Sequence, residues 1–227
     1  MTHRLRGVLW VALALTMPSA PAAADGAVTA PGLLSDADFY RLVSCAAPPG
    51  GACATAPIRW DTERAIRVAL RRIDPGFLGR RKPRAEAAFA RALDALKSAG
   101  ANVRLARVGA ADPAEILVYF LDLAPGDAIA GTGIDWVDGA AIDEVATLIA
   151  VEPGKPRIHA AVVVVASSLE TAAFEGAMLK GLTRAMGLTT EIAGPAYRET
   201  SALAQGSFAA KSLGAQDRAP LRQHYRA

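Results

Sequence analysis

Residues 174–188 of this chain read FEGAMLKGLTRAMGL, and they decide the fold more than any other stretch. Ser167 and Glu170 predict a capping box ahead of a helix, and Gly187 predicts its end. Four consecutive valines, 162–165, precede this helix and are typical of a strand inside a sheet. The helix is expected to bury one apolar stripe, made of Phe174, Met178, Leu182 and Met186.

The same helix has the spacing of a zinc-peptidase active site without its chemistry. In that motif, H-E-x-x-H-x-x-G, two His ligands lie one turn apart with a Glu base beside them. Lys180 and Arg184 stand at the two His positions, and Gly181 stands at the Glu position. Thr190 stands where a third His would be, and only Gly187 keeps the motif. Two cations repel Zn²⁺ and no base remains to activate water, so we expect no metal and no cofactor.

The first 24 residues predict export. Arg4 and Arg6 precede an apolar stretch, 8–17, and small residues then lead to an A-x-A site ending at Ala24. A membrane-spanning helix needs about 20 apolar residues, so we expect cleavage, a periplasmic or secreted protein and no stable membrane span afterwards. Cleavage lowers the net charge from +3 to +1, which argues against nucleic-acid binding.

The chain after the signal peptide (1–24) divides into an Ala/Pro/Gly-rich segment (25–57) and one larger domain (58–227). Cys45 and Cys53 are the only cysteines, and a Pro-Pro-Gly-Gly turn separates them. In an exported protein this pattern predicts a disulfide. The alternative, a metal pair, lacks partners because neither His159 nor His224 lies near a cysteine in sequence.

Strand-like and helix-like segments alternate along the rest of the chain. The order β-α-β-β-β-β-α matches the N-terminal half of metzincin-type zincins, although another α/β sandwich could share it. We expect an α+β fold, an α/β sandwich whose mixed sheet has about five strands, with a helix after the first strand and a central helix without zinc ligands. The expected strands are 65–73, 103–108, 115–123, 145–151 and 159–166, and the expected helices are 35–44, 83–100, 167–186 and 216–225.

Lys180 and Arg184 are the main candidate site residues, because they lie one turn apart on one helix face. With Thr190 nearby, they could form the floor of an anion-binding cleft where zinc would otherwise be. The alternative is a solvated helix face, or local ion pairs with Glu175 or Glu191.

Charge is segregated along the sequence. Residues 108–154 contain nine acids and no Lys or Arg, whereas residues 58–84 contain nine basic residues and three acids. This could steer a charged partner, and the acidic loop could hold Ca²⁺, but without a D-x-D-x-D-G run a solvated loop is favoured. We expect Arg80, Arg81 and Lys82 to end a loop in solvent.

A pattern of residues recurs at Arg59-Trp60, 181–188, Ser207-Phe208, Leu213, Asp217, Leu221, Arg222 and Tyr225. In this pattern, and above all in its C-terminal third, the chain resembles an exported bacterial family, family 2927 of domains of unknown function. The resemblance spans about residues 58–225 and implies a zincin that has lost its zinc ligands. The members carry two acids and a Gln where this chain has Lys180, Gly181 and Arg184, so the resemblance supplies no catalytic residue.

Two functions follow from these observations. The first is a non-enzymatic envelope protein whose zincin-like domain binds a peptide, protein or glycan in the cleft between the 167–186 helix and the 145–151 strand. Its partner would be anionic if Lys180 and Arg184 face that cleft. The second is a hydrolase acting without zinc. A buried acid with a raised pKa facing Lys180 would favour the enzyme, and an apolar groove beside a free strand edge would favour the binder.

Overall fold

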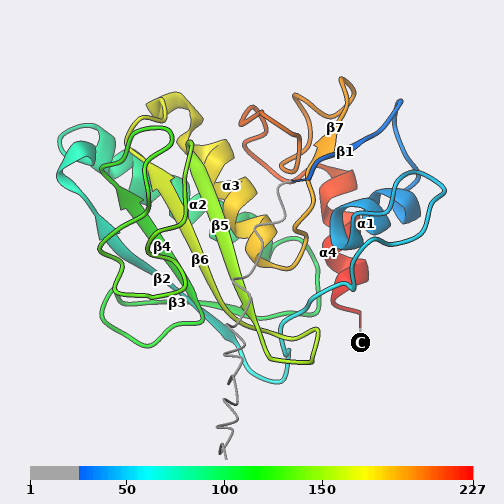
Figure 1. Cartoon of the computed structure of the whole chain (residues 1–227), viewed down its shortest axis with the longest axis horizontal. Coiled ribbons are helices and arrows are strands. Elements are labelled where there is room, and N and C mark those ends of the chain that lie inside the picture. The colour runs from blue at the N-terminus through cyan, green and yellow to red at the C-terminus, as the bar shows by residue number, and fades with distance from the viewer. Residues whose placement is uncertain (1–25, 227) are drawn as a thin grey trace, which may run out of the picture.

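A five-stranded mixed sheet organises the molecule, and the computed structural model describes residues 26–226 of it (Figure 1). The predicted signal peptide lies outside this range. The strand order is β3-β2-β4-β6-β5, in which β5 is antiparallel to β6 and every other neighbouring pair is parallel. The strands are β2 (Ile66–Ile73), β3 (Leu105–Val108), β4 (Ile116–Leu121), β5 (Val145–Val151) and β6 (Ile158–Ala166).

The five strands confirm the predicted α+β class, and β4 and β6 are the most deeply buried. Val162 through Val165 are fully buried, as four consecutive valines predict for a strand covered on both faces. β4 lies at the centre of the sheet and β6 next to it, which leaves β5 at one edge. The edge strand is therefore within reach of solvent.

Two different layers cover the two faces of the sheet. Helices α2 (Arg81–Lys97) and α3 (Phe174–Ala185) pack against each other on one face. On the other face the turn-rich loop 124–143 supplies Ile129, Val137 and Ile142 to a second hydrophobic cluster with residues of β4 and β6. The acidic loop therefore has a packed apolar side and does not simply extend into solvent.

Helix α3 begins later than predicted. Ser167 is not its N-cap, because the Ser167 hydroxyl donates to Asp122 Oδ1 at 2.6 Å and a short 3₁₀ turn, Thr171–Ala173, precedes Phe174. The apolar stripe is buried as predicted. Gly187 follows the helix with a φ of +89°, the left-handed conformation that ends many helices.

The N-terminal and C-terminal segments form one lobe beside the sheet (Figure 1). Helix α1 (Asp36–Cys45) packs against α4 (Ala215–His224), and Ser35 caps α1 through the Asp38 amide. Strand β1 (Val28–Thr29) pairs with β7 (Ile192–Ala193). Segment 26–57 is therefore integrated into the main core, and the predicted Cys45–Cys53 disulfide closes its loop.

A buried histidine joins α4 to the rest of this lobe. His224 is 1% exposed; its Nε2 is 2.9 Å from the Ile58 carbonyl and its Nδ1 is 3.3 Å from the Tyr40 hydroxyl. The carbonyl requires a proton on Nε2, so Nδ1 accepts from Tyr40. Burial lowers the pKa of His224 to about 4; the Ile58 contact opposes this change and Arg59 adds to it. His224 is therefore neutral in the folded protein near neutral pH.

None of the helices within residues 26–226 is both long and apolar enough to cross a membrane.

Candidate functional site

Lys180 lies inside the protein and not on a solvated helix face. It is 4% exposed, and its Nζ donates to the Ala204 carbonyl at 2.6 Å and to Glu191 Oε2 at 3.2 Å. The same Nζ lies 4.9 Å from the centroid of the Phe208 ring. Burial lowers the pKa of Lys180, whereas the Glu191 carboxylate opposes that change. Lys180 therefore has a full set of partners from the chain itself.

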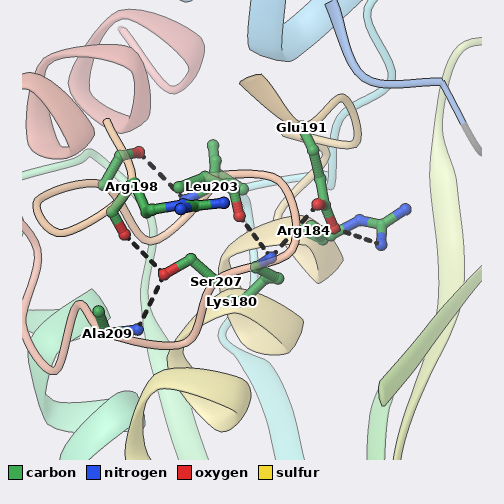
Figure 2. A network of polar contacts seen from close by, with 9 residues as sticks. Lys180, Arg184, Glu191, Arg198, Leu203, Ser207 and Ala209 are labelled. Atoms are coloured by element: carbon green, nitrogen blue, oxygen red, sulfur yellow. Dashed lines mark hydrogen bonds and ion pairs between the residues drawn. The ribbon is translucent and has the colours of Figure 1, made fainter. Parts of the chain in front are cut away.

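Glu191 occupies the space between the two predicted site cations (Figure 2). Its second carboxylate oxygen, Oε1, is 3.4 Å from Arg184 Nη1, so one acid bridges both side chains. This bears out the ion-pair alternative with Glu191, whereas Glu175 pairs with Arg91 instead. A bridged pair of cations offers much less attraction to an outside anion than two free ones.

A strap of residues 204–209 crosses α3 and holds this cluster in place. Lys180 binds the strap at Ala204, and the Ser207 hydroxyl donates to the Arg198 carbonyl at 2.6 Å (Figure 2). Gly176 lies directly under the strap, where a Cβ atom would overlap the Phe208 carbonyl. The missing side chain at Gly176 is what allows the strap to lie so close to the helix.

Gly181 packs on the sheet and leaves no room for a catalytic acid. A Cβ atom there would be 2.5 Å from Val163 Cγ1 and 3.6 Å from Thr147 Oγ1. A Glu at this position would have to enter the helix–sheet contact. Nor do residues 26–226 contain any group of three or more His, Cys, Asp or Glu side chains that could hold a metal ion. Position 181 therefore supplies no base, and the described residues supply no metal ligand set at this place.

A small pocket opens between α3, the start of β5 and the strap. Its volume is about 130 Å³. The expected electropositive character is absent, because three acids and two cations line this pocket. Thr190, the third candidate residue, does not line it; its side chain is buried and its amide donates to the Val43 carbonyl. The lining residues are Asp143, Glu144, Val145, Thr147, Lys180, Arg184, Glu191, Gly206 and Phe208.

The outer edge of β5 continues from this pocket with unpaired backbone groups. The Ala166 amide donates to the Glu144 carbonyl, which fixes the hydrogen-bonded positions in the antiparallel ladder with β6. Because such positions alternate, the N–H and C=O groups of Val145, Thr147 and Ile149 point away from β6. No other backbone segment within residues 26–226 hydrogen-bonds to these three residues. The edge can therefore accept another strand.

The buried acid with a raised pKa lies elsewhere and has a structural role. Asp217 is 1% exposed; burial raises its pKa, and hydrogen bonds from Ser201, Ala202 and Gly214 oppose the change. Its carboxylate accepts from the Ser201 hydroxyl at 2.7 Å and from the amides of the other two residues. These contacts fix the start of α4 and do not involve Lys180.

A larger cavity, of about 480 Å³, lies at the amino-terminal ends of the parallel strands. Two ion-paired groups lie in it: Arg67 pairs with Glu115 at 2.6 Å, and Arg157 lies within 4 Å of both Asp61 and Glu152. Arg64 also lines the cavity and has no ion pair among the described residues. His159, the exposed histidine of this region, also lines it. Most of the charged side chains of this cavity are thus paired with one another.

Side chains of the basic segment, residues 58–84, bond to the rest of the protein more than its composition suggested. Arg81, expected in solvent, donates to three carbonyls, those of Gly76, Ser167 and Leu169, and its guanidinium lies over the Phe77 ring. Arg72 pairs with Asp74 at 2.7 Å. In the acidic loop, Asp138 accepts from the Thr132 hydroxyl and caps a turn. The Arg67–Glu115 ion pair joins the basic segment to the acidic one.

The sequence pointed to Lys180 and Arg184 but missed the residues that complete their surroundings. Glu191 appeared only as a possible partner, and Asp143 and Glu144 only within a count of acids. Phe208 carried part of a family resemblance without a role. No protein-family model and no curated protein matches the chain.

Proposed function

We propose that this protein is a non-enzymatic binding protein that accepts an extended peptide segment as an added strand on β5. The free backbone edge at Val145, Thr147 and Ile149 carries the proposal. A peptide bound there would form main-chain hydrogen bonds along the edge and place alternate side chains towards α3. The pocket at the start of β5 would then receive one of those side chains.

We infer that the scaffold is a zincin-like domain without catalytic function, as the family resemblance implies. The element order, the antiparallel edge strand and the helix beside it support this inference. The site itself supports it chemically, because Lys180, Gly181 and Arg184 stand where a metal site needs ligands and a base. A Cys45–Cys53 disulfide and the signal-like N-terminus support export to the periplasm or beyond.

A hydrolase acting without zinc is the less favoured alternative. The observation that would support it is a buried acid with a raised pKa facing Lys180. The buried acid with a raised pKa is Asp217, which caps α4 and does not bond to Lys180, so this support is missing. An apolar groove beside a free edge would have favoured the binder, but the pocket beside β5 is charged, so the binding proposal depends on the free edge.

Strand addition can be tested by selecting capped six-residue peptides from a random display library and recording amide hydrogen exchange. Bound peptide should slow exchange at Val145, Thr147 and Ile149 while leaving Ala146 and Leu148, which already bond to β6, nearly unchanged. Binding without protection of the first three amides would place the peptide elsewhere. Failure to select any binding peptide would refute the proposal.

A proline at one edge position provides the matched variant. Thr147→Pro removes an outward N–H and obstructs an added strand, yet keeps the bonds to β6 because Thr147 makes none in that ladder. Peptide affinity should fall by about tenfold or more, since a hydrogen bond is lost and the ring blocks approach. Thr147→Val keeps the N–H and loses only the hydroxyl contact to Gly181, so it should bind like the wild type.

A further inference from the structure

The small pocket has more acids than cations in its lining, and two of those acids have no ion-pair partner. Both cations, Lys180 and Arg184, already bond to Glu191. The remaining two acids, Asp143 and Glu144, are exposed and have no ion pair within the described part of the chain. The Arg184 Nε is buried from solvent and is not offered to a ligand. An entering group therefore meets two unmatched carboxylates.

These carboxylates have a fixed position relative to the free strand edge. The Glu144 carbonyl accepts from the Ala166 amide at 2.8 Å, so the ladder with β6 extends to the residue just before β5. Asp143 and Glu144 thus stand at one end of the row formed by Val145, Thr147 and Ile149. A side chain on the first residues of an added strand would reach them directly.

We propose that this pocket binds a Lys or Arg side chain of the peptide that adds to β5. The inference rests on the proposed strand addition and names the chemistry that selects the peptide. The volume, about 130 Å³, is well below the ~300 Å³ of typical small-molecule sites and suits one side chain. With three acids against two cations the lining carries a net charge of −1, which favours a cation over the anion expected from Lys180 and Arg184 alone.

A metal ion is the other cation that carboxylates could attract. Hard cations such as Ca²⁺ take six or more oxygen ligands close together. The three acids of this pocket do not form such a cluster, since no metal-holding group occurs in residues 26–226. Glu191 is moreover engaged with two cations (Figure 2). A flexible organic cation can approach Asp143 and Glu144 without rearranging the site.

The test uses capped six-residue peptides of alternating Thr and Val that carry one Lys, Gln or Glu, scanned along the sequence, with affinity measured by fluorescence anisotropy. At the best position Lys should bind about fivefold more tightly than Gln, the size expected for a partly exposed ion pair, and Glu more weakly still. The Lys advantage should shrink as salt rises, because the interaction is screened.

Two double variants test whether the preference for the Lys peptide arises in the pocket. Asp143→Asn/Glu144→Gln should abolish the Lys advantage, so that the Lys and Gln peptides bind with about equal affinity. The control Asp135→Asn/Glu199→Gln makes the same charge change at exposed acids that do not line the pocket, and should keep the advantage.

Each outcome separates the two proposals. Equal affinity for the three peptides, with the β5 amides protected, would overturn the cationic specificity and leave strand addition standing. Tighter binding of the Glu peptide would also overturn it and return the site to an anion receptor. If no peptide binds and no amide of β5 is protected, both proposals fail.

Discussion

Acidification should destabilise this protein through His224. The folded protein holds the imidazole neutral with a pKa of about 4, whereas the unfolded chain takes up a proton near the ordinary value of 6.5. The stability linked to this residue is therefore complete above about pH 6.5 and is lost as the pH falls towards 4. Each pH unit between the two values is worth about 1.4 kcal/mol, so the full effect is about 3 kcal/mol.

Urea unfolding followed by circular dichroism, repeated from about pH 7.5 to about pH 4, measures this effect. His224→Gln isolates it, because an amide can donate to Ile58 and accept from Tyr40 but does not titrate. The variant should be less stable near neutral pH, and the difference from wild type should shrink by about 3 kcal/mol on acidification. The exposed His159 provides the control, and His159→Gln should follow the wild-type curve.

Parallel pH curves for wild type and His224→Gln would refute this reasoning. Acid-sensitive carboxylates contribute equally to both proteins, so they cancel in the comparison. Such a result would mean that water or a rearrangement of Tyr40 solvates the imidazolium in the folded protein.

Four further outcomes follow from the structure. Lys180→Glu should reduce the free energy of unfolding by about 3–5 kcal/mol, because it breaks a buried ion pair, and an unchanged thermal midpoint would contradict that burial. Gly176→Ala should cost about 2 kcal/mol by forcing the strap away from α3, whereas Gly32→Ala, in open space, should be nearly neutral; similar midpoints would argue against the close contact. Replacing Cys45 and Cys53 by Ala should lower stability by about 2.5 kcal/mol, and equal stability with and without reductant would disprove that contribution. Elemental analysis after dialysis should find no stoichiometric zinc, and one zinc per chain would contradict the degenerate-site proposal.

Secondary structure followed from the sequence where periodicity was strong. β5 matches its predicted bounds, and β6 begins one residue from its predicted start, because apolar runs between turns leave few alternatives. The start of α3 did not follow, since Ser167 resembles an N-cap locally but bonds to Asp122 on another strand. The strand order was also beyond the sequence, because the pairing of β4 with β2 and β6 depends on contacts between distant residues.

In the site, too, features set by neighbouring residues could be predicted, and features set by residues distant in sequence could not. The spacing of Lys180 and Arg184 correctly placed both on one turn of one helix. The burial of Lys180 could not be predicted from spacing, because Glu191 and the strap carbonyl of Ala204 come from segments that fold back over the helix. Exposure was the default expectation for two basic side chains, and it was wrong for Lys180.

The packing of α1 against α4 has a consequence for folding during translation. About 170 residues separate the two helices, and translation at about 5–20 residues per second needs roughly 9–34 s to produce them. During that time Phe39, Leu42 and Val43 of the nascent chain have no helix to cover them, although all three are fully buried at the end. The contact between α1 and α4 can therefore form only after Ala215–His224 has been synthesised.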